Sequence, residues 1–310
     1  MTIHANLEMI ADPFQGILLD AYGVFWGGNS IGPLPGSKEM MEKLIQQGKI
    51  IGILSNATQP AKKEIEKIAA HGLIQGIHFH FFITSGDVTR ALFLEDTLPF
   101  PTPRKKYYLL GTPHPNYASH QVVFHGTPYT ETPHITEADF IYLAVPHING
   151  QDQTNPALFR QEVEKLQQLR RQKLGSTAPI QDLPMICANP DRFAQEGNPP
   201  RAVVRQGSIA NIYEELGGHA LYIGKPSAGM YAAAMTHFSS FGITDQQQVL
   251  MVGDTPETDI RGARNYGMPS ALVLNTGIFA EKAAHFSIHE ILAQLDPLEQ
   301  PNFFIERMGK

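Results

Sequence analysis

Two short segments that carry aspartates each follow an apolar run, at widely separated places in the chain. Asp20 comes after residues 17–19 (ILL), and residues 253–259 (GDTPETD) come after residues 249–252 (VLMV). Parallel strands of an open α/β sheet gather such turns at one edge, because their carboxyl ends point the same way. An aspartate nucleophile that shares a hard cation with other carboxylates performs phosphoryl transfer through an aspartyl-phosphate. The sequence therefore predicts a reaction class before it predicts a substrate.

Two further polar segments follow apolar runs in the same manner. Ser55 and Asn56 come after residues 50–54; such a pair is more often a helix N-cap, but a hydroxyl and amides at a helix N-terminus also suit phosphate oxygens. Lys225 follows residues 221–224, and the proline after it excludes a P-loop, which requires Ser or Thr there. A lone lysine is usually solvated, so Lys225 gains meaning only beside the aspartates.

Composition narrows the class of protein. The 310 residues are 42% hydrophobic and 17% charged, as in ordinary soluble globular proteins. A net charge of −6 argues against nucleic acid as a partner. The sole cysteine, Cys187, fits a reducing compartment, and neither a signal peptide nor a membrane-spanning run is apparent. We expect a cytoplasmic protein that contacts no membrane.

Strand and helix patterns alternate at both ends of the chain and predict a doubly wound parallel sheet. The predicted elements of this core are strands at 17–20, 50–54, 79–83, 221–223, 249–252 and 271–274, and helices at 37–47, 60–70, 87–94, 230–238 and 259–266. A Pro-rich stretch at 99–103 opens a region of different texture. There we predict strands at 107–110, 122–124, 140–145, 185–188 and 202–204, and helices at 155–172 and 208–216. The interpretation is a core domain of residues 1–89 and 220–310, interrupted by an inserted domain of residues 90–219.

Taken together, these segments resemble the haloacid dehalogenase superfamily. Its four motifs are similar to DAYGV (20–24), SNAT (55–58), GKP (224–226) and GDTPETDI (253–260), in that order. Within the insertion, ANPD (188–191) and GSI (207–209) resemble the class IIA subgroup of pyridoxal phosphate, nitrophenyl phosphate and nucleotide or sugar phosphatases. The resemblance covers nearly the whole chain and implies a Rossmann-like core with a C2-type α/β cap.

The resemblance also implies roles for single residues. Asp20 would be the nucleophile, while Ser55 and Lys225 would hold the transferring phosphoryl group. Gly23 and Asn56 would border the bound phosphate. Asn189 and Asp191 would face the leaving group from the cap.

A magnesium ion is the implied cofactor. Its ligands would be Asp20, the backbone carbonyl of Tyr22, and Asp254, with Asp259 in or just outside the coordination shell. Aspartates this close would repel one another unless a cation lay between them, and magnesium prefers such oxygen ligands.

Tyr22 departs from the family pattern, which usually has a second aspartate there to protonate the leaving alcohol and activate water. A phenol with a pKa of about 10 starts protonated but is a poor base at neutral pH. We therefore expect a slow or unusual phosphatase. Two alternatives stay open: a phosphotransferase that uses the same intermediate, and an impaired protein that binds a phosphorylated metabolite.

Other features carry weaker expectations. The histidines at 114, 120, 125 and 134 are expected on the surface of the cap, and no zinc site is expected. Trp26 is expected either to line the entrance under the cap or to pack in the core. The partner is a small phosphate ester, and a homodimer would be unsurprising.

Overall fold

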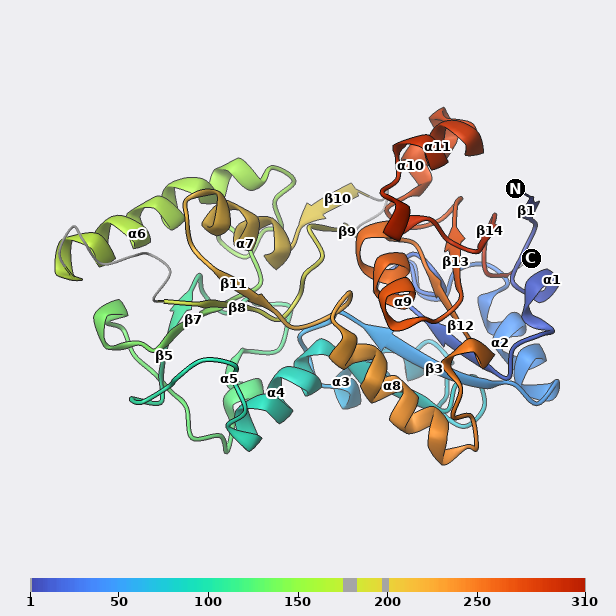
Figure 1. Cartoon of the computed structure of the whole chain (residues 1–310), viewed down its shortest axis with the longest axis horizontal. Coiled ribbons are helices and arrows are strands. Elements are labelled where there is room, and N and C mark those ends of the chain that lie inside the picture. Colours follow the sequence, from blue (N-terminus) through green and yellow to red (C-terminus); the bar gives the residue numbers. More distant parts are fainter. Residues whose placement is uncertain (1, 175–182, 197–200, 310) are drawn as a thin grey trace.

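The structure is a computed structural model and describes residues 2–174, 183–196 and 201–309. Two units lie side by side along the long axis of the molecule, each built on its own sheet (Figure 1). One contains a sheet of seven strands in the order β1-β14-β13-β12-β2-β3-β4, here called the main sheet. The other contains five strands in the order β11-β8-β7-β5-β6, here called the cap sheet.

The main sheet is wholly parallel. Its strands are β1 (Ile3–His4), β2 (Gly16–Leu19), β3 (Ile50–Ser55), β4 (Phe81–Thr84), β12 (Val249–Gly253), β13 (Ser270–Val273) and β14 (Phe303–Ile305). The chain runs outward from β2 through β3 to β4, and after the insertion it continues from β12 on the other side of β2. The strand order therefore reverses between β2 and β12, which is where open α/β sheets bind ligands.

Helices cover both faces of the main sheet, which explains why its strands are continuous apolar runs. One face packs against α1 (Glu8–Ala11), α2 (Ser37–Gln46) and α3 (Ala61–Ala69), and the other against α8 (Ala228–Ser240) and α9 (Arg261–Tyr266). Along β2, Ile17 and Leu19 face the first group while Leu18 faces the second. Near the carboxyl terminus, α10 (Ala280–His285) and α11 (Ile288–Gln294) pack through Phe279 and Ile291 onto β13 and β14.

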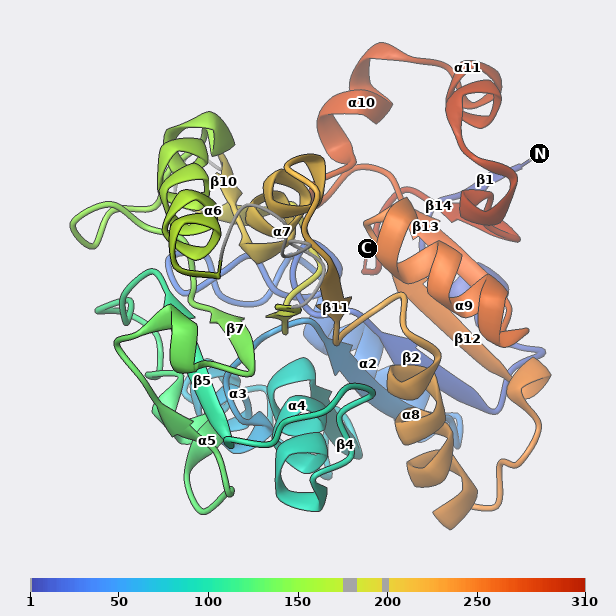
Figure 2. The ribbon, with the colours of Figure 1, turned by 60° about the vertical axis from the view of Figure 1, so that its left-hand side comes forward.

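The cap sheet is also parallel and carries its own apolar core. Its strands are β5 (Lys106–Leu110), β6 (Thr130–Glu131), β7 (Phe140–Leu143), β8 (Met185–Cys187) and β11 (Ala220–Tyr222). The long α6 (Arg160–Leu174) and α7 (Gln206–Glu215) cover one face, and the aromatic rings of α4 (Ser85–Glu95) and α5 (Gln121–Phe124) cover the other. Figure 2 shows α6 and α7 together on the side of this sheet away from α4 and α5.

A separate antiparallel hairpin, β9 (Phe193–Glu196) with β10 (Arg201–Val204), extends from the cap (Figure 1). The two sheets confirm the predicted α/β class with a parallel main sheet and a second parallel sheet. The domain limits of 1–89, 90–219 and 220–310 stay a prediction.

Two predicted elements were wrong. Residues 122–124 belong to the helix α5 and not to a strand, because a short apolar run does not reveal its own period; Phe124 stacks on Tyr107 with ring centroids 3.7 Å apart. The strand predicted at 221–223 exists as β11, but it pairs with β8 in the cap sheet instead of joining the main sheet. Chain return to the core thus occurs after Tyr222, which places Lys225 on the connection between the two units.

Candidate functional site

Three aspartates meet at the carboxyl edge of the main sheet. Asp20 follows β2 and Asp254 follows β12, and these strands are direct neighbours. Asp259 lies in a π-helical turn over Pro256–Ile260 that follows β12. One carboxylate oxygen from each of the three lies within 4.8 Å of the others, and all three side chains are largely buried.

Lys225 enters this cluster from the connection between the two sheets. Its Nζ lies 2.5 Å from Oδ1 of Asp20 and 2.7 Å from Oδ1 of Asp259, and the side chain is almost fully buried. Burial alone would lower the pKa of Lys225, but Asp20, Asp259 and Asp191 raise it on balance. The ammonium group therefore stays charged and offsets part of the negative charge around it.

The acidic turn is held together by its own backbone. Oδ2 of Asp259 accepts hydrogen bonds from the backbone N–H groups of Asp254 and Thr255, each at 3.1 Å. Oδ2 of Asp254 accepts from the N–H of Ile278 at 2.7 Å. Asp259 also contacts Lys225, so most of its carboxylate lone pairs are occupied by protein partners. Asp254 and Asp20 retain oxygen lone pairs that could bind a cation.

Negative charge exceeds positive charge in this cluster. Burial raises the pKa of Asp20 well above its usual value, against the opposing effect of Lys225. Burial, followed by repulsion from Asp259, raises the pKa of Asp254 to about 7. Both shifts mean that the ionised carboxylates are destabilised here, and a cation bound between them would remove that penalty.

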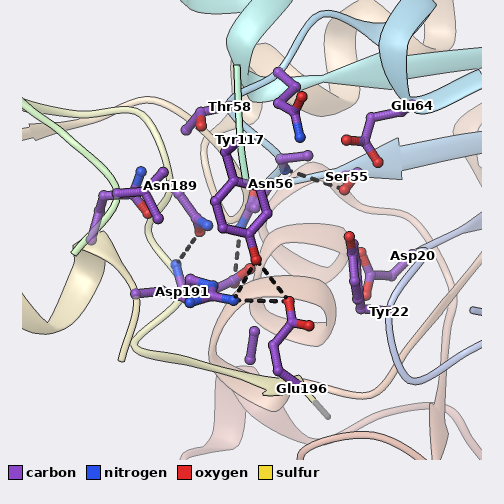
Figure 3. A pocket seen from close by; sticks show the side chains of 16 residues that line it. Asp20, Tyr22, Ser55, Asn56, Thr58, Glu64, Tyr117, Asn189, Asp191 and Glu196 are labelled. Carbon is purple, nitrogen blue, oxygen red and sulfur yellow. Dashed lines mark hydrogen bonds and ion pairs between the residues drawn. The ribbon is translucent and has the colours of Figure 1, made fainter. Parts of the chain in front are cut away.

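Ser55 and residues 188–191 of the cap, here called the cap loop, approach the same cluster from two sides. The Ser55 hydroxyl accepts a hydrogen bond from the N–H of Ala57 at 3.2 Å and, among the described residues, donates to no acceptor. Asn189 accepts from the N–H of Asp191 through its side-chain oxygen at 2.9 Å, which fixes the loop as an Asx turn. Ser55, Asn189 and Asp191 all line the same pocket as Asp20 (Figure 3).

Asn56 fastens the cap loop to the core. Its Nδ2 donates to Asp191 at 2.9 Å and to the backbone carbonyl of Lys225 at 3.2 Å. Its Oδ1 accepts from the N–H of Lys225 at 2.7 Å. Both amide hydrogens of Asn56 are therefore occupied. Only the second lone pair of its Oδ1 could contact a substrate, and that contact stays a prediction.

Tyr22 lines the pocket beside Asp20, and its phenol is tied to the helix α3. Lys67 donates to the Tyr22 hydroxyl at 2.9 Å and also forms an ion pair with Glu64. Burial, with the Glu64 and Glu196 carboxylates, raises the pKa of Tyr22 well above its usual value. The phenol is therefore protonated at neutral pH, while the Tyr22 carbonyl accepts no hydrogen bond from the described residues.

Gly23 lies beside Asp254, and its contact with a bound phosphate stays a prediction. Its N–H donates to the carbonyl of Trp26 at 2.9 Å, so it is not available to a bound anion. Its φ of +77° and its packing explain the glycine instead, since a Cβ at this position would lie 2.2 Å from Oδ2 of Asp254. The residue lets the turn after β2 lie directly against the acidic turn after β12.

We expect Gly23→Ala to destabilise the protein by on the order of 3 kcal/mol, because backbone strain and overcrowding add. Gly48→Ala is a matched control: Gly48 has a φ of +80° with no atom within 4 Å of the added Cβ, so it should cost only the backbone strain, about 1–2 kcal/mol. Urea unfolding of both variants measures the difference. Equal losses would show that crowding against Asp254 contributes nothing.

Several pocket residues carry no sequence signal that singled them out. The lining includes Glu64 of α3 and, from the cap, Tyr117, Glu196 and Arg205 (Figure 3). Glu64 could have been noticed as an acidic residue between the apolar positions of an amphipathic helix. The three cap residues come from separate segments, and only folding brings them together.

The weaker expectations divide. His125 and His134 are exposed as predicted, but His114 and His120 are buried in the cap, where His120 pairs with Glu131 at 2.7 Å. Trp26 is fully buried in the core of the main domain and does not line the pocket.

Family comparisons agree with this architecture. The family model described as haloacid dehalogenase-like hydrolase matches residues 17–122, and a second, described as HAD-hydrolase-like, matches residues 222–298. These matches flank the greater part of the cap and contain the turns that carry Asp20, Ser55, Lys225 and Asp254. The chain belongs to the haloacid dehalogenase-like hydrolases, class IIA.

Individual relatives point the same way. Chronophin from Bos taurus is 27% identical over 281 residues, covering 88% of this chain and 85% of its own. A 4-nitrophenylphosphatase from Schizosaccharomyces pombe is 24% identical over 319 residues, covering 96% and 93%. The structure of a haloacid dehalogenase-like hydrolase from Brucella suis superposes with a TM-score of 0.75 at 22% identity, covering 99% and 100%, and supports the fold.

Among the described residues, no helix is long and apolar enough to cross a membrane.

Proposed function

We propose that this protein is a magnesium-dependent phosphatase that hydrolyses a small phosphorylated metabolite of the sugar, nucleotide or pyridoxal phosphate class. The observation that carries the proposal is the contact of Lys225 with both Asp20 and Asp259 in a buried cluster at the reversal point of the main sheet. A nucleophile, a fixed cation and further carboxylates are together the groups that phosphoryl transfer needs. A cytoplasmic location and a homodimer remain parts of this proposal that rest on the sequence.

In the first step, a carboxylate oxygen of Asp20 attacks phosphorus, and the bond from phosphorus to the ester oxygen breaks. Lys225 and the free hydroxyl hydrogen of Ser55 stabilise the charge on the phosphoryl oxygens. The leaving alkoxide takes a proton from the Tyr22 phenol, which is protonated at neutral pH. In the second step, water attacks phosphorus, its proton returns to Tyr22, and inorganic phosphate and the Asp20 carboxylate are released.

Asp20, Asp254 and the carbonyl of Tyr22 would hold the magnesium ion, with Asp259 orienting the turn and Lys225. The donor set fits, because these are oxygen ligands, the carboxylates are buried, and one lysine does not neutralise three of them. When bound, magnesium offsets the charge of the carboxylates and the phosphoryl oxygens.

We expect magnesium to raise the melting temperature of the wild-type protein, because it binds the folded state alone. At a magnesium concentration about 100 times its dissociation constant, the free energy of unfolding rises by about 2.7 kcal/mol. Asp254→Asn should lose most of this gain, whereas Glu257→Gln, an exposed carboxylate in the same turn, should keep it. Thermal unfolding with and without magnesium makes the comparison, and an equal gain in all three proteins would place the ion elsewhere.

Release of inorganic phosphate from p-nitrophenyl phosphate tests the function itself. We expect turnover with magnesium and none in EDTA. Transfer of the phosphoryl group to added alcohols, rising with their concentration, would indicate a phosphotransferase. Binding of phosphate esters without turnover would indicate the metabolite-binding alternative.

A further inference from the structure

The part of the pocket that the cap contributes contains a fixed carboxylate. Glu196 ends the strand β9 of the cap hairpin, and Figure 3 shows it below Tyr117 in the middle of the view, with Asp20 and Tyr22 to their right. Its Oε1 accepts from Arg205 at 2.9 Å and from the Tyr117 hydroxyl at 3.2 Å. Its second oxygen, Oε2, accepts no hydrogen bond from the described residues.

Arg205 holds this carboxylate and has nothing left for a ligand at its two terminal nitrogens. One of them donates to Asp152 and to the carbonyl of Val204, both at 3.1 Å. The other donates to Tyr117 at 3.2 Å and to Glu196 at 2.9 Å. Arg205 is only 5% exposed, so it acts as a positioning group.

A second carboxylate faces the pocket from the core. Glu64 of α3 uses Oε2 for Lys67, and its Oε1 has no hydrogen-bond partner among the described residues. An adjoining hollow shares Tyr22, Gln59, Glu64, Tyr117 and Glu196 with the pocket. This hollow also contains Lys67, which is bound to Glu64 and Tyr22, and the exposed Lys63, whose ammonium group lies 3.8 Å from Glu66.

Glu196 Oε2 and Glu64 Oε1 are therefore unused carboxylate acceptors in the pocket, whereas its lining cation among the described residues, Arg205, is already bound to protein. A leaving group that brings a hydrogen-bond donor can pair with Glu196, whereas a second anion would meet two carboxylates and, among the described residues that line the pocket, no free cation.

We propose that Glu196, positioned by Arg205 and Tyr117, selects substrates whose leaving group carries a hydrogen-bond donor, either a hydroxyl or a protonated amine, and disfavours a second anionic group. This inference rests on the proposed phosphatase function and narrows its substrate class.

Four phosphate esters of similar length test the inference by binding, which requires no turnover. Glycerol phosphate carries hydroxyls, phosphoethanolamine an amine, phosphoglycolate a carboxylate, and n-propyl phosphate no polar group. Calorimetry with the Asp20→Asn variant in magnesium should give the tightest binding for a donor-bearing ester, about tenfold tighter than propyl phosphate. Phosphoglycolate should bind most weakly, and the better of the two donor esters identifies the donor as hydroxyl or ammonium.

Adding Glu196→Gln to this variant should remove about tenfold of the preference for the donor ester, leave propyl phosphate unchanged and improve phosphoglycolate binding. Tyr117→Phe, which keeps the charge but loosens Glu196, should reduce the same preference by less. Glu95→Gln, an exposed carboxylate on α4, is the control that should change nothing.

An equal effect of Glu196→Gln on all four esters would contradict the inference and assign the residue a structural role. The same holds if phosphoglycolate binds tightest before the change, or if the four esters bind without preference or not at all. Failure of the phosphatase proposal would appear separately, as absence of phosphate release from wild-type protein.

Discussion

Asp20→Asn should lower phosphatase turnover by on the order of 10⁴-fold or more, because an amide cannot form the covalent intermediate. The side chain keeps its size, and the burial that raises the pKa of Asp20 penalises the charge that the substitution removes. We therefore expect the variant to fold and to bind phosphate esters. Phosphate release from p-nitrophenyl phosphate in magnesium measures the loss.

Asp12→Asn is the matched control, since Asp12 is an exposed aspartate at the end of α1. It should retain wild-type turnover. Turnover in Asp20→Asn within about tenfold of wild type would show that another group is the nucleophile, because loss of the attacking atom costs far more.

Tyr22→Asp should raise kcat by about 10²-fold, because the raised pKa of the Tyr22 phenol makes it a weak acid for the leaving alcohol, whereas a carboxyl group exchanges protons more readily near neutral pH. The gain should be larger for alkyl phosphates, whose leaving groups need protonation, than for p-nitrophenyl phosphate.

Tyr22→Phe separates the phenol from the ring that carries it. It should lower turnover of alkyl phosphates by about tenfold or more if the hydroxyl supplies the proton, and leave p-nitrophenyl phosphate nearly unaffected. If Tyr22→Asp left kcat unchanged or lower while magnesium binding persisted, Tyr22 would not limit acid–base catalysis.

The sequence was sufficient to predict the core of the site because each of its motifs is local. Asp20, Ser55 and Asp254 each come at the end of an apolar run or directly after it, and parallel strands bring such ends to one edge. The strand before Lys225 was predicted in the wrong sheet, because a run of three residues does not reveal which sheet it joins. Lys225 still reaches Asp20, since β11 delivers the chain to the junction of the two sheets.

The part of the pocket formed by Tyr117, Glu196 and Arg205 could not be predicted in this way. Tyr117 and Arg205 are separated by 88 residues, and Glu196 lies at the end of a short hairpin strand that the sequence did not predict. Their role becomes apparent only from the hydrogen bonds among them, and their spacing in the sequence matches no known motif. For Gly23 the motif was recognised from the sequence, but the hydrogen bond of its N–H to Trp26 and its packing against Asp254 were not.

Chemical trapping of the intermediate tests the central claim most directly. Wild-type protein turning over p-nitrophenyl phosphate in magnesium would be quenched with acid and reduced with borohydride, which converts an aspartyl-phosphate to homoserine. Peptide mass spectrometry should then find homoserine in place of Asp20, and not in a sample treated with EDTA. Turnover in magnesium that leaves Asp20 unmodified, or modifies another aspartate, would contradict the account.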